Sequence, residues 1–131
     1  MNACKCELEI DKNGPLEFVK SWSDSKGVYA QFKPVYVHPP TCSQAKGCQQ
    51  GVKYKWVLIP DIAGTAAING KDDEEVITVK HELISSQANI KISLTVTVTV
   101  ECDTVYMTPG QPTVVIKRHK SDSGTDDSIL F

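Results

Sequence analysis

The five cysteines are the residues of this 131-residue chain with the widest chemistry. Cysteines form disulfides, bind soft metal ions as thiolates, or remain thiols. Cys42 and Cys48 lie in a segment rich in Gly and Pro, His38–Gly51, and a local disulfide between them would pin that segment. Because the loop that it closes is short, this bond would contribute roughly 2–3 kcal/mol in the chain-entropy model. Two thiols in a reducing compartment are the alternative.

A metal site is a second interpretation of the same residues, since thiolates and imidazole suit tetrahedral zinc. The candidate ligands are Cys4, Cys6, His38, Cys42 and Cys48. Their spacing lacks the CxxC pattern of a zinc knuckle, so we expect no metal and no other cofactor. Cys102 ends an apolar strand face and is expected to be a small core residue. It would instead meet Cys4 or Cys6 if the first strand lay beside its own strand.

Catalytic patterns are missing from the sequence, and we expect the protein not to be an enzyme. The three histidines are scattered over a loop, a strand and the polar C-terminal segment, which gives no Ser-His-Asp or Cys-His arrangement. A formal net charge of −2 offers no electrostatic attraction for nucleic acid. No stretch is long and apolar enough to span a bilayer. The expected partners are therefore other protein subunits, including further copies of this chain.

Two groups of apolar residues are candidates for binding a partner. Trp22 and Tyr36, together with Tyr29, would form an exposed aromatic surface for a protein or a sugar. The apolar end Ile129, Leu130 and Phe131 follows a polar spacer and would dock in a groove or on a sheet edge of a neighbouring subunit. A frayed terminus is the alternative for this end.

The element that should organise these residues is a strand over Ile90–Cys102, reading IKISLTVTVTVEC. Apolar residues occupy every even position and polar residues every odd one, which is the period of a half-buried strand. An exposed edge of this composition would template aggregation, so we place the strand centrally in a sheet. Its even-numbered face should pack on Trp56 and Phe32.

Other segments carry the same type of pattern between turn signals at intervals of about ten residues. The further predicted strands are Cys4–Ile10, Val28–Val37, Val52–Ile59, Val76–Leu83 and Thr113–Lys117. Leu16–Trp22 fits either a short helical turn or an irregular strand, and His38–Gly51 is expected to be a loop. The sequence thus predicts an all-β protein, a single immunoglobulin-like antiparallel β-sandwich of about seven strands. We assign residues 1–117 to this domain and residues 118–131 to a flexible polar tail with an apolar tip.

The region Val52–Cys102 resembles bacterial immunoglobulin-like and PKD-like domains. The residues that carry the resemblance are Tyr54-x-Trp56 on a strand, the turn Asn69-Gly70, and the Val/Thr-rich strand that follows. The resemblance implies an adhesive or structural role. A PKD domain would continue past its Trp into Gly-Asp-Gly, which is missing here. Val28–Val37 has no cysteine, so the inter-sheet disulfide of antibody domains is not expected.

The functional prediction is a non-catalytic structural or interaction module, a subunit or accessory protein of a larger extracellular or phage-like assembly. A carbohydrate-binding or cell-surface adhesion module is one alternative, and a small cysteine-liganded metal protein is another. The N-terminus, MNACKCELEIDKNGP, lacks the apolar region of a signal peptide. We therefore expect cytosolic synthesis followed by incorporation into a virion or another extracellular particle.

Overall fold

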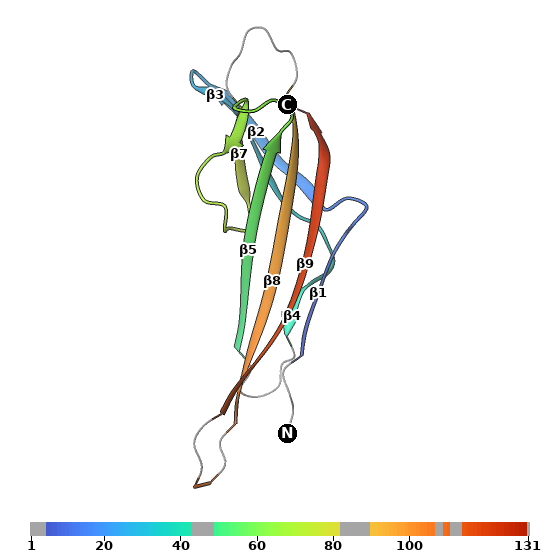
Figure 1. Ribbon diagram of the computed structural model, residues 1–131, viewed down its shortest axis with the longest axis vertical. Coiled ribbons are helices and arrows are strands. Elements are labelled where there is room, and N and C mark those ends of the chain that lie inside the picture. The colour runs from blue at the N-terminus through green and yellow to red at the C-terminus, as the bar shows by residue number, and fades with distance from the viewer. Residues whose placement is uncertain (1–4, 43–48, 82–89, 107–108, 111–113, 131) are drawn as a thin grey trace.

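The computed structural model describes residues 5–42, 49–81, 90–106, 109–110 and 114–130. These residues form an all-β protein of antiparallel sheets, elongated along the direction of its longest strands (Figure 1). The described strands are β1 (Cys6–Ile10), β2 (Leu16–Asp24), β3 (Gly27–Pro34), β4 (Tyr36–Cys42), β5 (Gln49–Pro60), β6 (Ala66–Ile68), β7 (Ile77–His81), β8 (Lys91–Tyr106) and β9 (Val114–Leu130). Within the described ranges, no helix has the length and apolar character needed to cross a membrane.

The first four strands fold as a long hairpin that is interrupted once. β2 pairs with β3, and β1 pairs with β4 further along the same two chain segments. Between the two pairings, Val35 donates its N–H to the Pro15 oxygen and accepts the Asp11 N–H, both at 2.9 Å. Pro34 ends β3 because a proline cannot donate to a sheet ladder. The predicted strand Val28–Val37 therefore exists as two strands separated by one residue.

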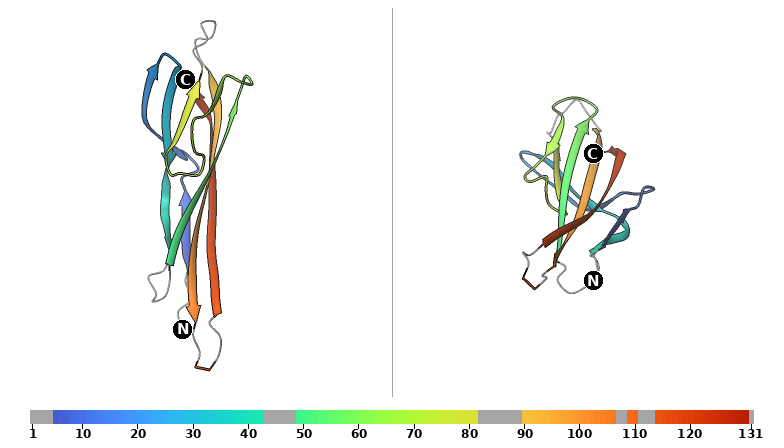
Figure 2. Two further views of the ribbon diagram at one scale, coloured as in Figure 1. Left: turned by 90° about the vertical axis from the view of Figure 1, so that its left-hand side faces the viewer. Right: turned by 60° about the horizontal axis from the view of Figure 1, so that its bottom comes forward.

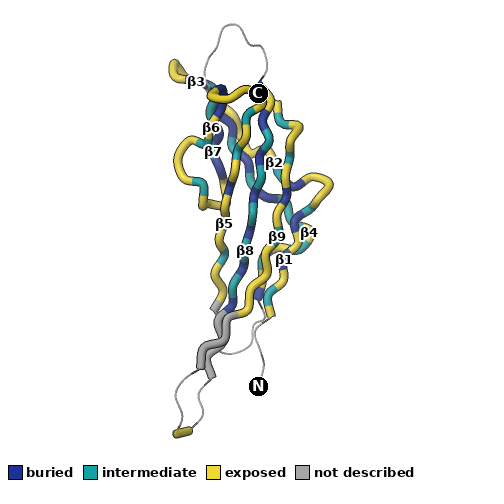
Figure 3. Tube along the Cα trace, in the orientation of Figure 1, coloured by how far each residue is buried: buried dark blue, intermediate teal, exposed yellow. Residues whose placement is uncertain are grey.

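The remaining strands complete two larger sheets. β2, β3, β7 and β6 form a four-stranded sheet in that order, and β5, β8 and β9 form a three-stranded one. β8 lies in the middle of its sheet, as its alternating sequence predicted. Its even-numbered side chains from Ile92 to Cys102 are all less than 2% exposed, whereas the odd-numbered ones of that stretch are half-buried (Figure 3).

The core lies between the three-stranded sheet and the strands of the other two sheets (Figure 2). Trp56 of β5 is paired with Val96 of β8, and both belong to one buried cluster that also contains Phe32 of β3. The predicted neighbours Trp56 and Phe32 thus share one core cluster with the β8 face. The predicted sandwich of about seven strands is not confirmed, since the described residues form nine strands in three sheets. The extra sheet arises because β1 and β4 continue the hairpin past the break at Val35.

One segment that was expected to be a loop and one that was expected to be a tail contain strands in the structure. β9 extends to Leu130 and pairs with β8 along most of its length, so residues 118–130 are not the polar tail that the composition suggested. The expected loop His38–Gly51 contains the second half of β4 and the start of β5, while residues 43–48 of it lie outside the described residues. Leu16–Trp22, for which the pattern left two possibilities, is strand β2.

Candidate functional site

The register of β1 against β4 decides the disulfide pairing. Cys6 lies directly opposite Cys42, with the two Cα atoms 4.0 Å apart, and the structure joins them by a disulfide. The predicted Cys42–Cys48 bond is therefore wrong, because Cys42 is already bonded across the hairpin. Cys4 and Cys48 lie outside the described residues. Local spacing suggested the near partner, whereas strand pairing selected one 36 residues away.

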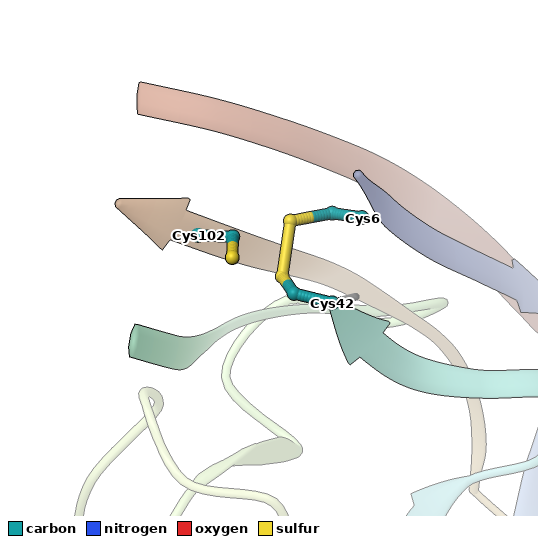
Figure 4. A group of neighbouring side chains, drawn as sticks. All are labelled: Cys6, Cys42 and Cys102. Carbon is teal, nitrogen blue, oxygen red and sulfur yellow. A yellow bond between two sulfur atoms is a disulfide. The ribbon is translucent and has the colours of Figure 1, made fainter. Parts of the chain in front are cut away.

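Cys102 brings a third sulfur to this bond from the opposite sheet. It is fully buried on the inward face of β8, and it is in the thiol state. The Sγ atoms of Cys6, Cys42 and Cys102 all lie within 4.8 Å of one another (Figure 4). Cys102 is thus a core residue, as expected, and its sulfur also meets that of Cys6, although β1 pairs with β4 and not with β8. We call this group the three-cysteine centre.

His38, the imidazole among the predicted metal ligands, is engaged elsewhere. Its Nε2 lies 3.0 Å from Glu7 Oε2, and its Nδ1 lies 2.8 Å from the Pro39 oxygen. It shares with Cys6 the lining of an open hollow of about 370 Å³ on the surface. Among the described residues, the group of ligand atoms within 4.8 Å of one another consists of the three cysteines and does not include His38.

Of the predicted aromatic surface, Trp22 and Tyr29 come together across β2 and β3, whereas Tyr36 lies in a different sheet. Trp22 is 39% exposed on β2 and stacks on Tyr29 with a centroid separation of 5.2 Å. Tyr36 packs against the core from β4. Burial, with smaller effects from Tyr54 and Glu75, raises the pKa of the Tyr36 hydroxyl well above its ordinary value. Tyr36 is therefore a packing residue, and Tyr29 is only 7% exposed, so the three aromatic residues do not form one exposed platform for sugar rings.

An apolar groove does form where the end of β9 approaches β2. It has a volume of about 280 Å³ and combines side chains of β2, β3 and β9. Its lining residues are Phe18, Ser21, Val28, Ala30, Phe32, Ile129 and Leu130. Two of the three predicted C-terminal binding residues, Ile129 and Leu130, thus belong to one surface, and Phe131 lies outside the described residues. We call this surface the β2–β9 groove.

Phe18 is the groove residue that the sequence reasoning missed. Its ring contacts Phe32 edge to face with centroids 6.0 Å apart, yet the residue remains 57% exposed. Leu130 on the other side of the groove is 64% exposed. The sequence signal was ambiguous because β2 alternates poorly, and its register shifts between Phe18 and Lys20. Only the strand pairing reveals which side chains of β2 face the groove.

The three-cysteine centre and the β2–β9 groove are described from the structure of this chain alone. The resemblance of Val52–Cys102 to immunoglobulin-like and PKD-like domains stays a prediction. No protein-family model, curated protein or solved structure matches this chain.

Proposed function

We propose that this protein is a non-catalytic structural and interaction module, a subunit or accessory protein of a larger extracellular or phage-like assembly. Its binding surface is the β2–β9 groove together with the neighbouring edge strand β2. The ligand is a polypeptide that places apolar side chains in the groove. The observation that carries the proposal is the exposure of Phe18 and Leu130 on opposite sides of one apolar hollow.

Phe18 and Leu130 leave apolar surface in contact with water. Complete burial of a Phe or Leu side chain contributes roughly 1.5–3 kcal/mol, and both groove residues still expose more than half of their surface. A partner that covers both therefore gains a substantial part of this energy. Binding hot spots are typically apolar anchors of this type that lie in a pocket and become shielded from water.

The position of β2 adds a backbone contribution. β2 is the outermost strand of the four-stranded sheet, and an extended segment can pair with such an edge. Lys20 and the irregular register beside Phe18 make the edge a poor template for unspecific pairing. A partner would therefore combine a few backbone hydrogen bonds with side chains that fit the groove. This combination favours a specific polypeptide over general aggregation.

The disulfide supports the extracellular part of the proposal. Disulfides persist in oxidising environments and are rare in reducing ones. Cys6–Cys42 connects two strands of the core and is flanked by a buried thiol. A particle that is exposed to oxidising conditions is therefore a consistent setting for this chain.

Cross-linking from inside the groove tests the proposal. A photo-reactive amino acid replaces Ser21, which lines the groove, and in a matched variant it replaces Ile59, which is 63% exposed on β5 at the far edge of the other sheet. We expect irradiation in the native source to give a discrete cross-linked polypeptide from position 21 and not from position 59. The proposal fails if position 21 gives no product, or if both positions give the same products.

A further inference from the structure

The three-cysteine centre joins both layers of the fold at one point. Cys6 and Cys42 come from the two-stranded sheet, whereas Cys102 comes from the central strand of the three-stranded sheet (Figure 4). Cys102 and Cys42 are 0% and 5% exposed, and Cys6 is half-buried. Three sulfurs within 4.8 Å of one another form the donor set that thiophilic metal ions require.

We propose that the reduced form of this protein binds one soft d¹⁰ cation, Zn²⁺ or Cu⁺, through Cys6, Cys42 and Cys102. The disulfide form excludes the ion, because two of the three sulfurs are then bonded to each other. Reduction consumes two equivalents of a thiol reductant, which becomes a disulfide and leaves Cys6 and Cys42 as thiols. The ion then displaces one proton from each of the three thiols. Metal occupancy is therefore controlled by the redox state of one bond.

The geometry fits such an ion with small movements. With Zn–S bonds of about 2.3 Å, sulfurs in a tetrahedral site lie about 3.8 Å apart, and in a trigonal site about 4.0 Å. The three Sγ atoms are already within 4.8 Å of one another while Cys6 and Cys42 are bonded. Release of that bond allows these two sulfurs to separate toward the required distance. The paired strands β1 and β4 hold both Cα positions during this change.

The surface around the centre gives an ion access to this point. Cys6 lines an open hollow of about 370 Å³, and Cys42 lines a second one of about 210 Å³, so an ion reaches the sulfurs from the surface. Three thiolates carry more negative charge than either ion neutralises. Lys5 and Lys120 line the same hollow as Cys6, but so do Glu7 and Glu9, so the lining carries both signs of charge. The case for the site therefore rests on the three sulfurs and their access to the surface.

The test uses the full chain with Cys4 and Cys48 replaced by Ser, which leaves only the three cysteines of the centre. The protein is reduced with a phosphine, which does not compete as a thiol ligand, and is titrated without oxygen against Zn²⁺ and separately against Cu⁺ in the presence of a chromophoric chelator. We expect one equivalent to bind to the reduced protein and none to the oxidised protein. The cation with the tighter competition constant is the preferred occupant.

The Cys102→Ser variant separates a three-sulfur site from a two-sulfur one. It retains the Cys6–Cys42 pair, and we expect it to bind at least about 10-fold more weakly, since even loss of an outer-shell partner typically costs 10–100-fold. Equal affinity in this variant, or binding to the oxidised protein, overturns the proposal. Circular dichroism covers the case in which reduction unfolds the chain. Refolding on addition of one equivalent of metal then supports the site, and failure to refold contradicts it.

Discussion

At Asp122, one carboxylate connects β9 to the start of the chain. Its Oδ2 accepts the Ile10 backbone N–H at 2.7 Å, and its Oδ1 accepts a charged hydrogen bond from Lys12 Nζ at 2.5 Å. Partial burial by itself would raise the pKa of Asp122. The hydrogen bonds from Lys12, Ile10 and Ser123 outweigh burial, so the pKa lies below its usual value. The folded state therefore favours the ionised carboxylate.

Replacement of Asp122 by Asn removes this charge while the shape of the side chain is nearly kept. We expect the free energy of unfolding at pH 7 to fall by about 1.5–3 kcal/mol, the typical range for a hydrogen bond to a charged group. Because the folded-state pKa is lowered, the contribution is present above the unfolded-state pKa of about 3.9 and is lost as the pH falls through the folded-state value. Urea denaturation over a series of pH values measures both effects.

Asp127→Asn is the matched control for this change, since Asp127 is an exposed carboxylate on the same strand. It should alter the unfolding free energy by less than about 0.5 kcal/mol at every pH. The interpretation of Asp122 is wrong if both variants lose the same stability. It is also wrong if the loss in Asp122→Asn stays constant down to the most acidic pH that the protein tolerates.

At the scale of elements, β9 is held close to β1 by the absence of a side chain at Gly124. A Cβ at this position would lie 2.4 Å from Cβ of Pro15 and 3.0 Å from Cγ2 of Ile10. Glycine within a strand commonly marks such a close backbone approach. Gly124 is one of the residues that made this segment look like a flexible tail. The structure requires glycine there because β9 packs closely against Pro15 and Ile10.

Gly124→Ala should consequently be destabilising, although alanine is the smallest possible addition. The Pro15 ring cannot rotate away from the new methyl group, so β9 must shift, and overpacking of this type costs about 1–3 kcal/mol. Thermal unfolding followed by circular dichroism is the measurement. Ser123→Ala changes an exposed neighbour and should leave the midpoint almost unchanged. Equal midpoints for Gly124→Ala and the wild type would refute the close packing.

The elements that the sequence predicts well are those whose signal is local. β8 alternates without interruption, so its existence, its central position and its buried face could all be inferred. β9 carries polar residues on both faces, and its pairing with β8 uses contacts such as Thr95 Oγ1 with Thr125 Oγ1 at 2.8 Å. Such contacts join residues 30 positions apart. No local pattern records them.

For the candidate sites too, features of a single strand could be predicted from the sequence, whereas features that depend on strand pairing could not. That Cys102 lies on a buried face could be read from β8 alone, and its proximity to the first strand could be raised as an alternative. The choice of Cys6 as the partner of Cys42 depends on the register of β1 and β4, which sequence spacing does not fix. Phe18 escaped notice because an irregular register separates it from the rest of β2.

At the scale of the whole molecule, the two proposed sites are far apart along an elongated body. Cys6 and Cys42 lie at the start of β1 and the end of β4, toward one end of the long axis, whereas β9 finishes near the other end (Figure 1). The three-stranded sheet runs between them, and β8 contributes more buried residues to the core cluster than any other strand. A change in the redox state of the three-cysteine centre and a change at the β2–β9 groove can therefore be studied separately.

Whether the β2–β9 groove binds a polypeptide can be measured by sedimentation velocity of the protein mixed with the purified partner that cross-linking from position 21 identifies. We predict that Phe18→Glu weakens the complex by about 10-fold or more, as expected for loss of an apolar anchor worth about 1.4 kcal/mol or more. Ile59→Glu, which changes an equally exposed apolar residue of β5, should leave the complex intact. If Phe18→Glu and the wild type form the complex to the same extent, the groove is not the binding site.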